Sequence, residues 1–420
     1  MKLLVIGSGG REHAICLALS KSTATTKIYV APGNAGIAEI AEIISLNLNN
    51  HNDIKEFCLE KQIELVVIGP EAPLVDGLVD YLENNGIKTF GPSKDTAILE
   101  ASKTFTKNLC KKYNIPTAQY ECFDNGHDAK TYLESTKFPV VIKADGLAAG
   151  KGVIIAENKH EAIIAIDEMF SGKFGVAGNN VVIEEFLEGK EISFFAICDG
   201  TRAIFLGAAE DYKRAFDNNK GLNTGGMGSF SPSRLLNDTL EAQIMDQIIN
   251  PTIHAMCAEG RPFKGMLFAG LMLTSEGPKL LEYNVRFGDP ETESILLCLK
   301  TDLLELLLAS INGALNEITI ERYNHHAVCV VMAADGYPGD YQKDTVISGL
   351  SEVSKLPNVY VFHAGTKKNH NNNIVTNGGR VLAITAIGNS LKEAREQAYN
   401  AVHKITWSEG FYRTDIASEF

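Results

Sequence analysis

The sequence predicts an α/β protein with a parallel sheet near its N-terminus and two further α/β units after it. Three observations carry this prediction. In the first hundred residues, short apolar runs alternate with helical patterns, which is typical of a parallel sheet covered by helices. Each run leads into a loop rich in glycine or proline. The length of 420 residues allows two to four domains, at roughly 150 residues each.

The composition excludes several classes of protein. The chain is 45% hydrophobic and 22% charged, which excludes a largely disordered, collagenous or coiled-coil chain. It carries 39 Lys and Arg against 52 Asp and Glu, a net charge of −13, so it lacks the cationic footprint of a nucleic-acid-binding protein. Any anionic ligand must therefore be held by a few local cations and by backbone N–H groups.

Membrane and metal signals are also missing from the sequence. The longest apolar stretch, at 303–311, is interrupted by Glu305 and is far shorter than the roughly 18 residues of a membrane span. The apolar run at the N-terminus is too short for a signal peptide. The cysteines are scattered without a Cys-x-x-Cys pair, as expected for reduced, mostly buried thiols. We therefore expect a cytoplasmic protein that binds neither membranes nor nucleic acid.

The first unit is predicted at residues 1–100. Strands are expected at 2–6, 27–30, 65–68 and 88–90, with helices at 12–20 and 52–61. The loops after these strands gather at the carboxyl edge of the sheet, where open α/β sheets bind ligands.

The rest of the chain is predicted to alternate in the same way. A single connecting helix is expected at 93–113, and residues 201–232 are predicted to be a long polar loop of functional importance. Further strands are expected at 139–143, 152–156, 181–185, 191–198, 266–274, 278–284, 326–333, 360–363 and 381–386. Further helices are expected at 159–170, 238–258, 292–312 and 391–405, and a turn at 369–373.

The loop from Gly7 to Glu12 follows a strand and opens a helix. Its free N–H groups, the positive helix end and Arg11 suit a phosphate group. Glu12 stands where a dinucleotide fingerprint has Gly or Ala, and the second strand lacks a terminal acid, which argues against NAD. The alternative is a tight turn without a ligand.

A second Gly-rich loop runs from Gly146 to Gly152. It is not a P-loop, because three residues separate its first two glycines and Gly152 follows Lys151. The flanking strands make it a hairpin loop, which can close over a triphosphate, with Lys143 as the charged contact. The alternative is an ordinary hairpin with a solvated lysine.

Polar residues alternate at the end of the strand at 278–284. Glu282, Asn284 and Arg286 share one face, because side chains alternate along a strand. The two oxygen donors suit Mg²⁺, and the guanidinium suits a phosphoryl or carboxylate group. The following turn adds Asp289 and Glu291. The alternative is a solvated strand face.

Two further segments give weaker signals. The strand-turn-strand pattern at 184–191 offers backbone groups to a planar base and a carboxylate to ribose hydroxyls. The segments 210–214 and 223–228 combine cations with a Gly-rich backbone, which suits anions. The alternative for 184–191 is a solvated acidic turn, and the alternative for 210–214 and 223–228 is a flexible surface loop.

Together these motifs resemble the phosphoribosylamine–glycine ligase family of the ATP-grasp superfamily, over essentially the whole chain. The resemblance rests on the runs 7–13 and 143–152, on Gly69-Pro70-Glu71, and most specifically on Arg286-Phe287-Gly288-Asp289-Pro290-Glu291. It implies an N-terminal parallel-sheet (pre-ATP-grasp) domain at 1–100 that binds phosphoribosylamine. It further implies a two-lobed ATP-grasp core at 101–324, with a lid subdomain at about 115–195, and a small C-terminal α/β domain at 325–420.

The same resemblance implies the reaction. ATP, glycine and 5-phosphoribosylamine give glycinamide ribonucleotide, ADP and phosphate through a glycyl phosphate, in de novo purine biosynthesis. The implied catalytic residues are Arg286 and Lys143. The implied ATP-binding residues are Lys103, Lys143, Gly150, Lys151 and Gly152 for the triphosphate, Glu184, Glu185, Phe186 and Leu187 for adenine, and Glu191 for ribose.

The implied metal is Mg²⁺ or Mn²⁺, bound by Glu282 and Asn284. Many superfamily members have another acidic ligand on the preceding strand, but here that strand contains Gly270-Leu271-Met272-Leu273, so only two protein ligands are expected. The implied substrate-binding residues are Gly9, Gly10, Arg11, Glu12, Pro70, Glu71, Asp211, Lys213, Asn223, Thr224, Gly225, Gly226, Asp289, Pro290 and Glu291.

Two alternative functions stay open on the sequence alone. One is another ATP-grasp ligase that acts on a purine intermediate, and the other is a nucleotide-binding regulatory module that uses only the N-terminal loop. The three predicted units use up the 420 residues, so we expect a monofunctional enzyme, acting as a monomer on small-molecule substrates.

Overall fold

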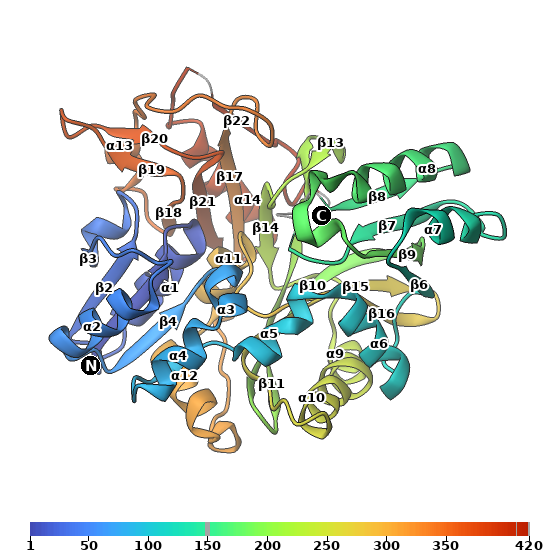
Figure 1. Cartoon of the computed structure of the whole chain (residues 1–420). Helices are drawn as coiled ribbons and strands as arrows, with labels where there is room; N and C mark the ends of the chain where they lie inside the picture. The colour runs from blue at the N-terminus through green and yellow to red at the C-terminus, as the bar shows by residue number, and fades with distance from the viewer. Residues whose placement is uncertain (148–151, 409, 419–420) are drawn as a thin grey trace.

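The computed structural model describes residues 1–147, 152–408 and 410–418. It contains a parallel sheet of five strands, an antiparallel sheet of nine strands and an antiparallel sheet of four strands, together with two small hairpins (Figure 1). The predicted α/β class is therefore confirmed.

The five-stranded sheet is built by the first ninety residues. Its strands are β1 (Lys2–Gly7), β2 (Lys27–Pro32), β3 (Glu42–Ile43), β4 (Leu65–Ile68) and β5 (Thr89–Phe90). They pair in parallel in the order β3-β2-β1-β4-β5, so β1 lies in the middle and the chain switches direction across the sheet there. The loops after β1 and β4 therefore meet at the topological switch point, where such sheets bind ligands.

Helices α1 (Gly10–Ser20), α2 (His51–Lys61), α3 (Glu71–Asp76) and α4 (Leu78–Asn84) connect these strands. Residues Leu3 to Ile6 of β1 are fully buried, as expected for a strand covered on both faces. The predicted loops after β1 and β4 each open a helix, α1 and α3 respectively.

The single helix predicted over 93–113 is wrong, because the structure has two helices there. They are α5 (Lys94–Ala101) and α6 (Lys103–Tyr113). Ser102 between them is extended, with φ −139° and ψ 111°, and its side chain accepts a hydrogen bond from Phe105 N. A serine that caps a new helix was the overlooked signal, since Ser competes with the backbone for N–H groups.

The four-stranded sheet lies to one side of the molecule, with helices α7 (Gly126–Tyr132) and α8 (Lys159–Glu168) (Figure 1). Its strands are β6 (Tyr120–Phe123), β7 (Val140–Ala144), β8 (Val153–Ala156) and β9 (Val181–Glu185), in the order β6-β9-β7-β8. Strands β7 and β8 pair antiparallel, so the second Gly-rich loop is a hairpin loop, as predicted.

The nine-stranded sheet forms the centre of the molecule (Figure 1). Its strands are β16 (Gly277–Asn284), β15 (Lys264–Thr274), β10 (Lys190–Asp199), β11 (Ala203–Asp211), β14 (Gly228–Ser231), β17 (His326–Ala334), β21 (Arg380–Gly388) and β18 (Val359–His363) in spatial order, with β22 (Gly410–Tyr412) beside β17. Antiparallel pairing of β14 with β17 makes the C-terminal strands part of this same sheet.

The long polar loop predicted over 201–232 is wrong. This segment contains β11 and β14 of the central sheet and a hairpin of β12 (Arg214–Phe216) and β13 (Lys220–Asn223). The Gly, Asn and Asp residues of its second half hid the apolar run from Ile204 to Ala209 at its start. Leu206, Ala208 and Ala209 of that run are buried between neighbouring strands.

Other helices follow the prediction with one further break. Helix α9 (Asp238–Ile244), a π-helical segment (Met245–Ile249) and helix α10 (Asn250–Ala258) together fill the predicted helical region at 238–258. Helix α14 (Leu391–Val402) follows β21. The helix predicted over 292–312 is divided into α11 (Glu291–Cys298) and α12 (Leu303–Asn312), because Asp302 caps α12 by accepting from Leu304 N. The turn predicted at 369–373 joins β19 (Thr366–Lys368) to β20 (Ile374–Thr376).

Within the described ranges, no helix combines the length and the apolar composition that crossing a membrane requires.

Candidate active site

Three buried charges meet beneath the hairpin of β7 and β8. The Glu184 carboxylate lies 2.9 Å from the Lys107 ammonium and 2.9 Å from the Lys143 ammonium. The three side chains are only 2%, 3% and 6% exposed, respectively. In the register of β7 and β9, Val141 faces Glu184, so Lys143 and Glu184 are diagonal neighbours on one face of the sheet.

Both oxygens of the Glu184 side chain contact the two lysines. The predicted contact between Glu184 and adenine would therefore come from the Glu184 backbone. Burial lowers the pKa of Lys107, and the Glu184 carboxylate opposes that decrease. Lys107 was missed by the sequence analysis. Its signal was the spacing of four residues from Lys103 on α6, which places both ammonium groups on one helix face.

The base of the Gly-rich hairpin is fixed to the start of α6. The Asp145 carboxylate accepts a hydrogen bond of 2.6 Å from Thr104 N and one of 3.1 Å from the Ser102 hydroxyl. The Lys103 ammonium donates to the Gly146 carbonyl at 3.2 Å. These contacts place the predicted triphosphate residues Lys103 and Lys143 at one end of the hairpin.

Part of that predicted set cannot be placed. Gly150 and Lys151 lie outside the described residues. Gly152 is described, and its carbonyl accepts from Ala144 N at 2.8 Å, which closes the hairpin at its base.

The predicted base-binding segment follows β9. The Glu185 carboxylate accepts from Gln119 N at 2.9 Å, and Phe186 is exposed. Leu187 is buried against Ala118 and Met272. These residues line the boundary between the four-stranded sheet and the central sheet.

Glu282 on β16 faces a group of cations. Burial alone would raise its pKa, but Lys213, Lys143, Lys103 and Arg286 together hold the pKa of this carboxyl below its ordinary value. The Lys143 ammonium also donates to the carbonyl of Leu281, the residue before Glu282, at 3.1 Å. The structure therefore brings the predicted phosphate-binding lysines and the predicted metal ligand Glu282 to one place.

The residues at the end of β16 fit a divalent cation that takes most of its ligands from substrate phosphates and water. In the part of the chain that the structure describes, no group of three or more His, Cys, Asp or Glu side chains could hold a metal ion. Glu282 and Asn284 offer two oxygen donors at the end of β16. Mg²⁺ accepts such a set, because it commonly takes one or two carboxylates together with substrate phosphates and water.

Arg286 connects this site to the N-terminal sheet. Its guanidinium donates to Asn284 Oδ1 at 3.0 Å, and it lies 3.4 Å from the Glu71 carboxylate and 3.5 Å from the Glu100 carboxylate. Burial would raise the pKa of Glu71, but Arg286 and Arg11 hold it below its ordinary value. Glu71 begins α3 directly after Pro70, so the Gly-Pro-Glu motif delivers its carboxylate to the site.

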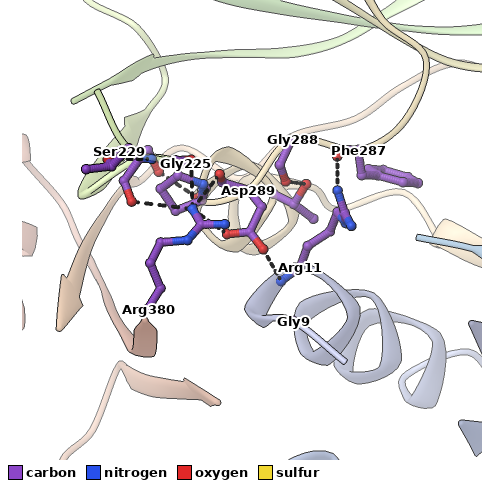
Figure 2. A network of polar contacts seen from close by, with 12 residues as sticks. Gly9, Arg11, Gly225, Ser229, Phe287, Gly288, Asp289 and Arg380 are labelled. Atoms are coloured by element: carbon purple, nitrogen blue, oxygen red, sulfur yellow. Dashed lines mark hydrogen bonds and ion pairs between the residues drawn. The ribbon is translucent and has the colours of Figure 1, made fainter. Parts of the chain in front are cut away.

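The N-terminal Gly-rich loop differs from the prediction in one respect. The sequence predicts free amide groups there, but Gly9 N donates to Glu12 Oε2 at 2.6 Å. A glutamate at the third helical position can reach back to the N-cap amide in this way. Arg11 N lies 3.5 Å from Asp289 Oδ2, and the Arg11 guanidinium donates to the Phe287 carbonyl at 3.1 Å (Figure 2).

Asp289 therefore links the N-terminal loop to the central sheet. Figure 2 shows its carboxylate between the first turn of α1 and Arg380, whose guanidinium lies 3.0 Å from Asp289 Oδ1. Arg380 also donates to the Gly225 carbonyl at 2.7 Å and to the Asp289 carbonyl at 2.8 Å. The predicted Gly7–Glu12 loop, the 223–226 segment and the Asp-Pro-Glu turn thus meet around one arginine that the sequence analysis missed.

The segment 223–226 is itself ordered by local contacts. The Thr224 hydroxyl donates to the Lys213 carbonyl at 2.8 Å and accepts from Gly226 N at 3.0 Å. Asn223 pairs with Arg214 in the hairpin of β12 and β13. Arg380 gave no local signal in the sequence, because it lies more than 150 residues after the glycines whose carbonyls it binds.

A second group of charges lies beside the cation cluster. The Lys213 ammonium is 2.6 Å from the Glu191 carboxylate and 4.0 Å from the Asp211 carboxylate. Ser193, which the sequence analysis also missed, has its hydroxyl 3.4 Å from Asp211 Oδ1 and 3.1 Å from Glu291 Oε1. The predicted residues Glu191, Asp211, Lys213 and Glu291 are therefore one connected group.

Three family models match the chain in order. They are the N domain of phosphoribosylglycinamide synthetase at residues 1–100, its ATP-grasp (A) domain at 101–292 and its C domain at 327–419.

Individual proteins give the same picture. A phosphoribosylamine–glycine ligase from Brucella melitensis is 50% identical over 416 residues, which cover 99% of this chain and 97% of that protein. The crystal structure of a phosphoribosylamine–glycine ligase from Thermotoga maritima has a TM-score of 0.87 at 34% identity, covering 99% of this chain and all of that one. N5-carboxyaminoimidazole ribonucleotide synthetase from Thermotoga maritima has a TM-score of 0.66 at 19% identity, covering 97% and 99% of the two chains, and shares the fold alone.

Proposed function

The chain belongs to the phosphoribosylglycinamide synthetase family, and we propose that it joins glycine to 5-phosphoribosylamine in an ATP-dependent reaction that gives glycinamide ribonucleotide, ADP and phosphate. This is a step of de novo purine biosynthesis. The observation that carries the proposal is the similarity over nearly the whole chain. A relative named phosphoribosylamine–glycine ligase is 50% identical and covers 99% of the chain. The geometry of the site supports each chemical requirement.

ATP is held between the four-stranded sheet and the central sheet. Lys103 and Lys143 take the triphosphate, together with the hairpin loop that contains Gly150, Lys151 and Gly152. The buried Lys143–Glu184 pair supports this role, because the carboxylate fixes the position of the lysine side chain. The backbone from Glu184 through Glu185 and Phe186 to Leu187 takes adenine, and Glu191 takes the ribose.

Glu282 and Asn284 hold Mg²⁺ or Mn²⁺, which neutralises charge on the phosphates when it is bound. The low pKa of Glu282 supports this role, because a ligand carboxylate must be ionised at neutral pH.

Glycine needs activation before it can form an amide, because a carboxylate has no good leaving group. Its carboxylate attacks the γ-phosphorus of ATP, and the glycyl phosphate that forms can lose phosphate to an amine. Phosphoryl transfer depends mostly on positioning and charge neutralisation. Arg286 supplies a fixed positive charge there, since Glu71, Glu100 and Asn284 all hold its guanidinium.

We place the ribosylamine phosphate near the N-terminal sheet, where the loop after β4 contacts Arg286 through Glu71 and the loop after β1 contacts Asp289. Figure 2 shows the second of these contacts. The proposed pocket residues are Gly9, Gly10, Arg11, Glu12, Pro70, Glu71, Asp211, Lys213, Asn223, Thr224, Gly225, Gly226, Asp289, Pro290 and Glu291. We also propose the domain limits 1–100, 101–324 and 325–420, and a monomer that acts in the cytoplasm.

The dependence of ADP release on glycine tests this function. The protein is incubated with ATP, Mg²⁺ and freshly generated 5-phosphoribosylamine, with and without glycine, and ADP and the nucleotide product are measured. We expect ADP and glycinamide ribonucleotide to form in equal amounts and only with glycine. ADP release at full rate without glycine would favour another ligase of purine intermediates, and nucleotide binding without turnover would favour a regulatory module.

A further inference from the structure

A serine hydroxyl lies between two buried carboxyl groups at the junction of β10, β11 and α11. Ser193 Oγ is 3.1 Å from Glu291 Oε1 and 3.4 Å from Asp211 Oδ1. Ser193 is 2% exposed, Glu291 is 3% exposed, and the Asp211 side chain is 7% exposed. The three groups thus form a line of hydrogen-bonding atoms that is shielded from solvent.

Without a bound proton, this line of three groups leaves one hydrogen bond unmade. A serine hydroxyl has one proton to donate, and an ionised carboxylate can only accept. Ser193 can therefore satisfy both neighbours only when one of the two carboxyl groups is protonated and donates to the hydroxyl oxygen. The unprotonated line therefore has a specific place for one incoming proton, on either Asp211 or Glu291.

The charges around the line support this conclusion. Burial raises the pKa of the Glu291 carboxyl to about 7, and the negative charge of Asp211 adds to the rise, while Arg286 and Lys213 oppose it. Burial also raises the pKa of Asp211, with Glu191 adding to the rise and Lys213 opposing it. Glu293, on the same helix as Glu291, is a further acid in this neighbourhood. The Glu291 carboxyl is therefore free of its proton above about pH 7 and can take one up there.

One end of the line faces the reaction site. Asp211 lies 4.0 Å from Lys213, whose ammonium contacts Glu191 and is the first of the cations that act on Glu282. Glu291 lies at the other end, behind Ser193, and is more deeply buried. A proton accepted by Asp211 can thus be passed inward to Glu291 by exchange through the serine hydroxyl.

We propose that Asp211, Ser193 and Glu291 form a proton relay that takes the proton of the ribosylamine nitrogen as it attacks the glycyl phosphate. This inference rests on the proposed function. Asp211 is the catalytic residue that contacts the amine, and Ser193 and Glu291 act through it.

The step balances within the proposed reaction. The nitrogen–carbon bond forms while the bond between the carbonyl carbon and the phosphate oxygen breaks, and phosphate leaves with that electron pair. The amine proton passes to Asp211, Asp211 passes a proton to the Ser193 oxygen, and the original hydroxyl proton of Ser193 moves to Glu291. The departing phosphate needs one proton to leave as the dianion, so the relay returns its proton and is reset for the next cycle.

The pH dependence of the rate tests the relay. The kcat for glycinamide ribonucleotide formation is measured from about pH 5.5 to pH 9 at saturating substrates for the full chain and for Glu291→Gln, Ser193→Ala and Glu293→Gln. Glu293→Gln is the matched control, because it removes a buried carboxyl from the same helix without touching Ser193. The affinity for Mg-ATP is measured alongside for each variant, to show that the fold and the nucleotide site are intact.

For the unaltered chain we expect kcat to fall as the pH decreases below about 7, because the protonated relay cannot accept another proton. Glu291→Gln should lower kcat about 10²-fold and move this acidic limb to lower pH, since Asp211 loses a neighbouring negative charge. Ser193→Ala should also lower kcat about 10²-fold, and Glu293→Gln should keep the limb in place.

Either of two results would overturn the relay. One is an acidic limb at the same pH in Glu291→Gln as in the unaltered chain, and the other is an unaltered chain without an acidic limb. A failure of the proposed function would look different, because the unaltered chain would then form no glycinamide ribonucleotide at any pH.

Discussion

The ammonium of Lys143 and the carboxylate of Glu184 lie 2.9 Å apart, and both side chains are almost completely buried. Lys107 lies at the same distance on the other oxygen of the carboxylate. Because a buried charge is costly unless it is paired, each of the three groups depends on the other two. The relationship fixes the side chain of Lys143, the lysine that we propose for phosphate binding, and it gives Glu184 a structural role beside its proposed role in nucleotide binding.

Glu184→Gln should therefore destabilise the protein strongly. The substitution removes the negative charge shared by Lys107 and Lys143, and breaking a buried pair costs about 3–5 kcal/mol. The free energy of unfolding in urea measures this loss. Glu185→Gln is the matched control, because that carboxylate is less buried and only accepts from a backbone amide, so its loss should cost about 1 kcal/mol. Equal losses in the two variants would contradict the role of the buried pair.

Arg286→Lys should lower kcat at least about 10²-fold and leave the affinity for ATP nearly unchanged. The guanidinium spans Glu71, Glu100 and Asn284 at once, which a single ammonium cannot reproduce. Steady-state kinetics together with ATP binding separate the two effects. A kcat close to that of the unaltered chain would show that Arg286 does not act on the transferring phosphoryl group.

Asp145→Ala should raise the KM for ATP and cost about 1 kcal/mol of stability. Asp145 holds the first turn of α6 through Thr104 N and the Ser102 hydroxyl, and that turn carries Lys103. Asn158→Ala is the matched control, since Asn158 caps α8 by accepting from Glu161 N at 3.1 Å. The control should lose similar stability with an unchanged KM, whereas a similar KM in both variants would count against the positioning role of Asp145.

Glu282→Gln should raise the Mg²⁺ concentration required for half-maximal activity by about tenfold or more. The amide retains one oxygen but loses the negative charge that Lys213, Lys143, Lys103 and Arg286 stabilise. A titration of activity with Mg²⁺ at fixed ATP measures the shift. An unchanged Mg²⁺ requirement would remove Glu282 from the proposed metal site.

Glu293→Gln should stabilise the protein more as the pH increases. Burial raises the pKa of Glu293 well above its ordinary value of 4.5, and both carboxyl oxygens lack a hydrogen-bond partner within the described residues. The folded chain therefore keeps a proton that the unfolded chain has lost, so stability falls as the pH rises above that ordinary value. Glutamine has no proton to lose at this position.

Thermal unfolding at about pH 5 and about pH 8 measures this effect. The melting temperature of Glu293→Gln should exceed that of the unaltered chain by a larger margin at the higher pH. A margin that is independent of pH would mean that Glu293 is ionised in the folded protein.

The sequence predicts the parts of the site that depend on local patterns. The loops after β1 and β4, the hairpin of β7 and β8, and the alternation of Glu282 and Asn284 on β16 all follow from spacing along a single element. The fold class also follows, because the alternation of strands and helices is strong in the first hundred residues.

The sequence does not predict contacts between distant elements. Lys107, Ser193 and Arg380 were missed because each acquires its role only when another element supplies its partner, such as Asp289 for Arg380. Strands β11 and β14 were missed because a Gly-rich hairpin separates them and because their partners, β10 and β17, lie outside the segment. The Gly9 amide of the N-terminal loop is likewise bonded to Glu12, and the loop pattern alone does not predict this contact.

The fate of the glycine carboxylate oxygen tests the central proposal most directly. Glycine labelled with ¹⁸O in its carboxylate is incubated with the protein, ATP, Mg²⁺ and 5-phosphoribosylamine, and the released phosphate is examined by mass spectrometry. Activation of glycine by phosphoryl transfer predicts that each phosphate carries one ¹⁸O atom. Unlabelled phosphate, released together with glycinamide ribonucleotide, would contradict the glycyl phosphate route.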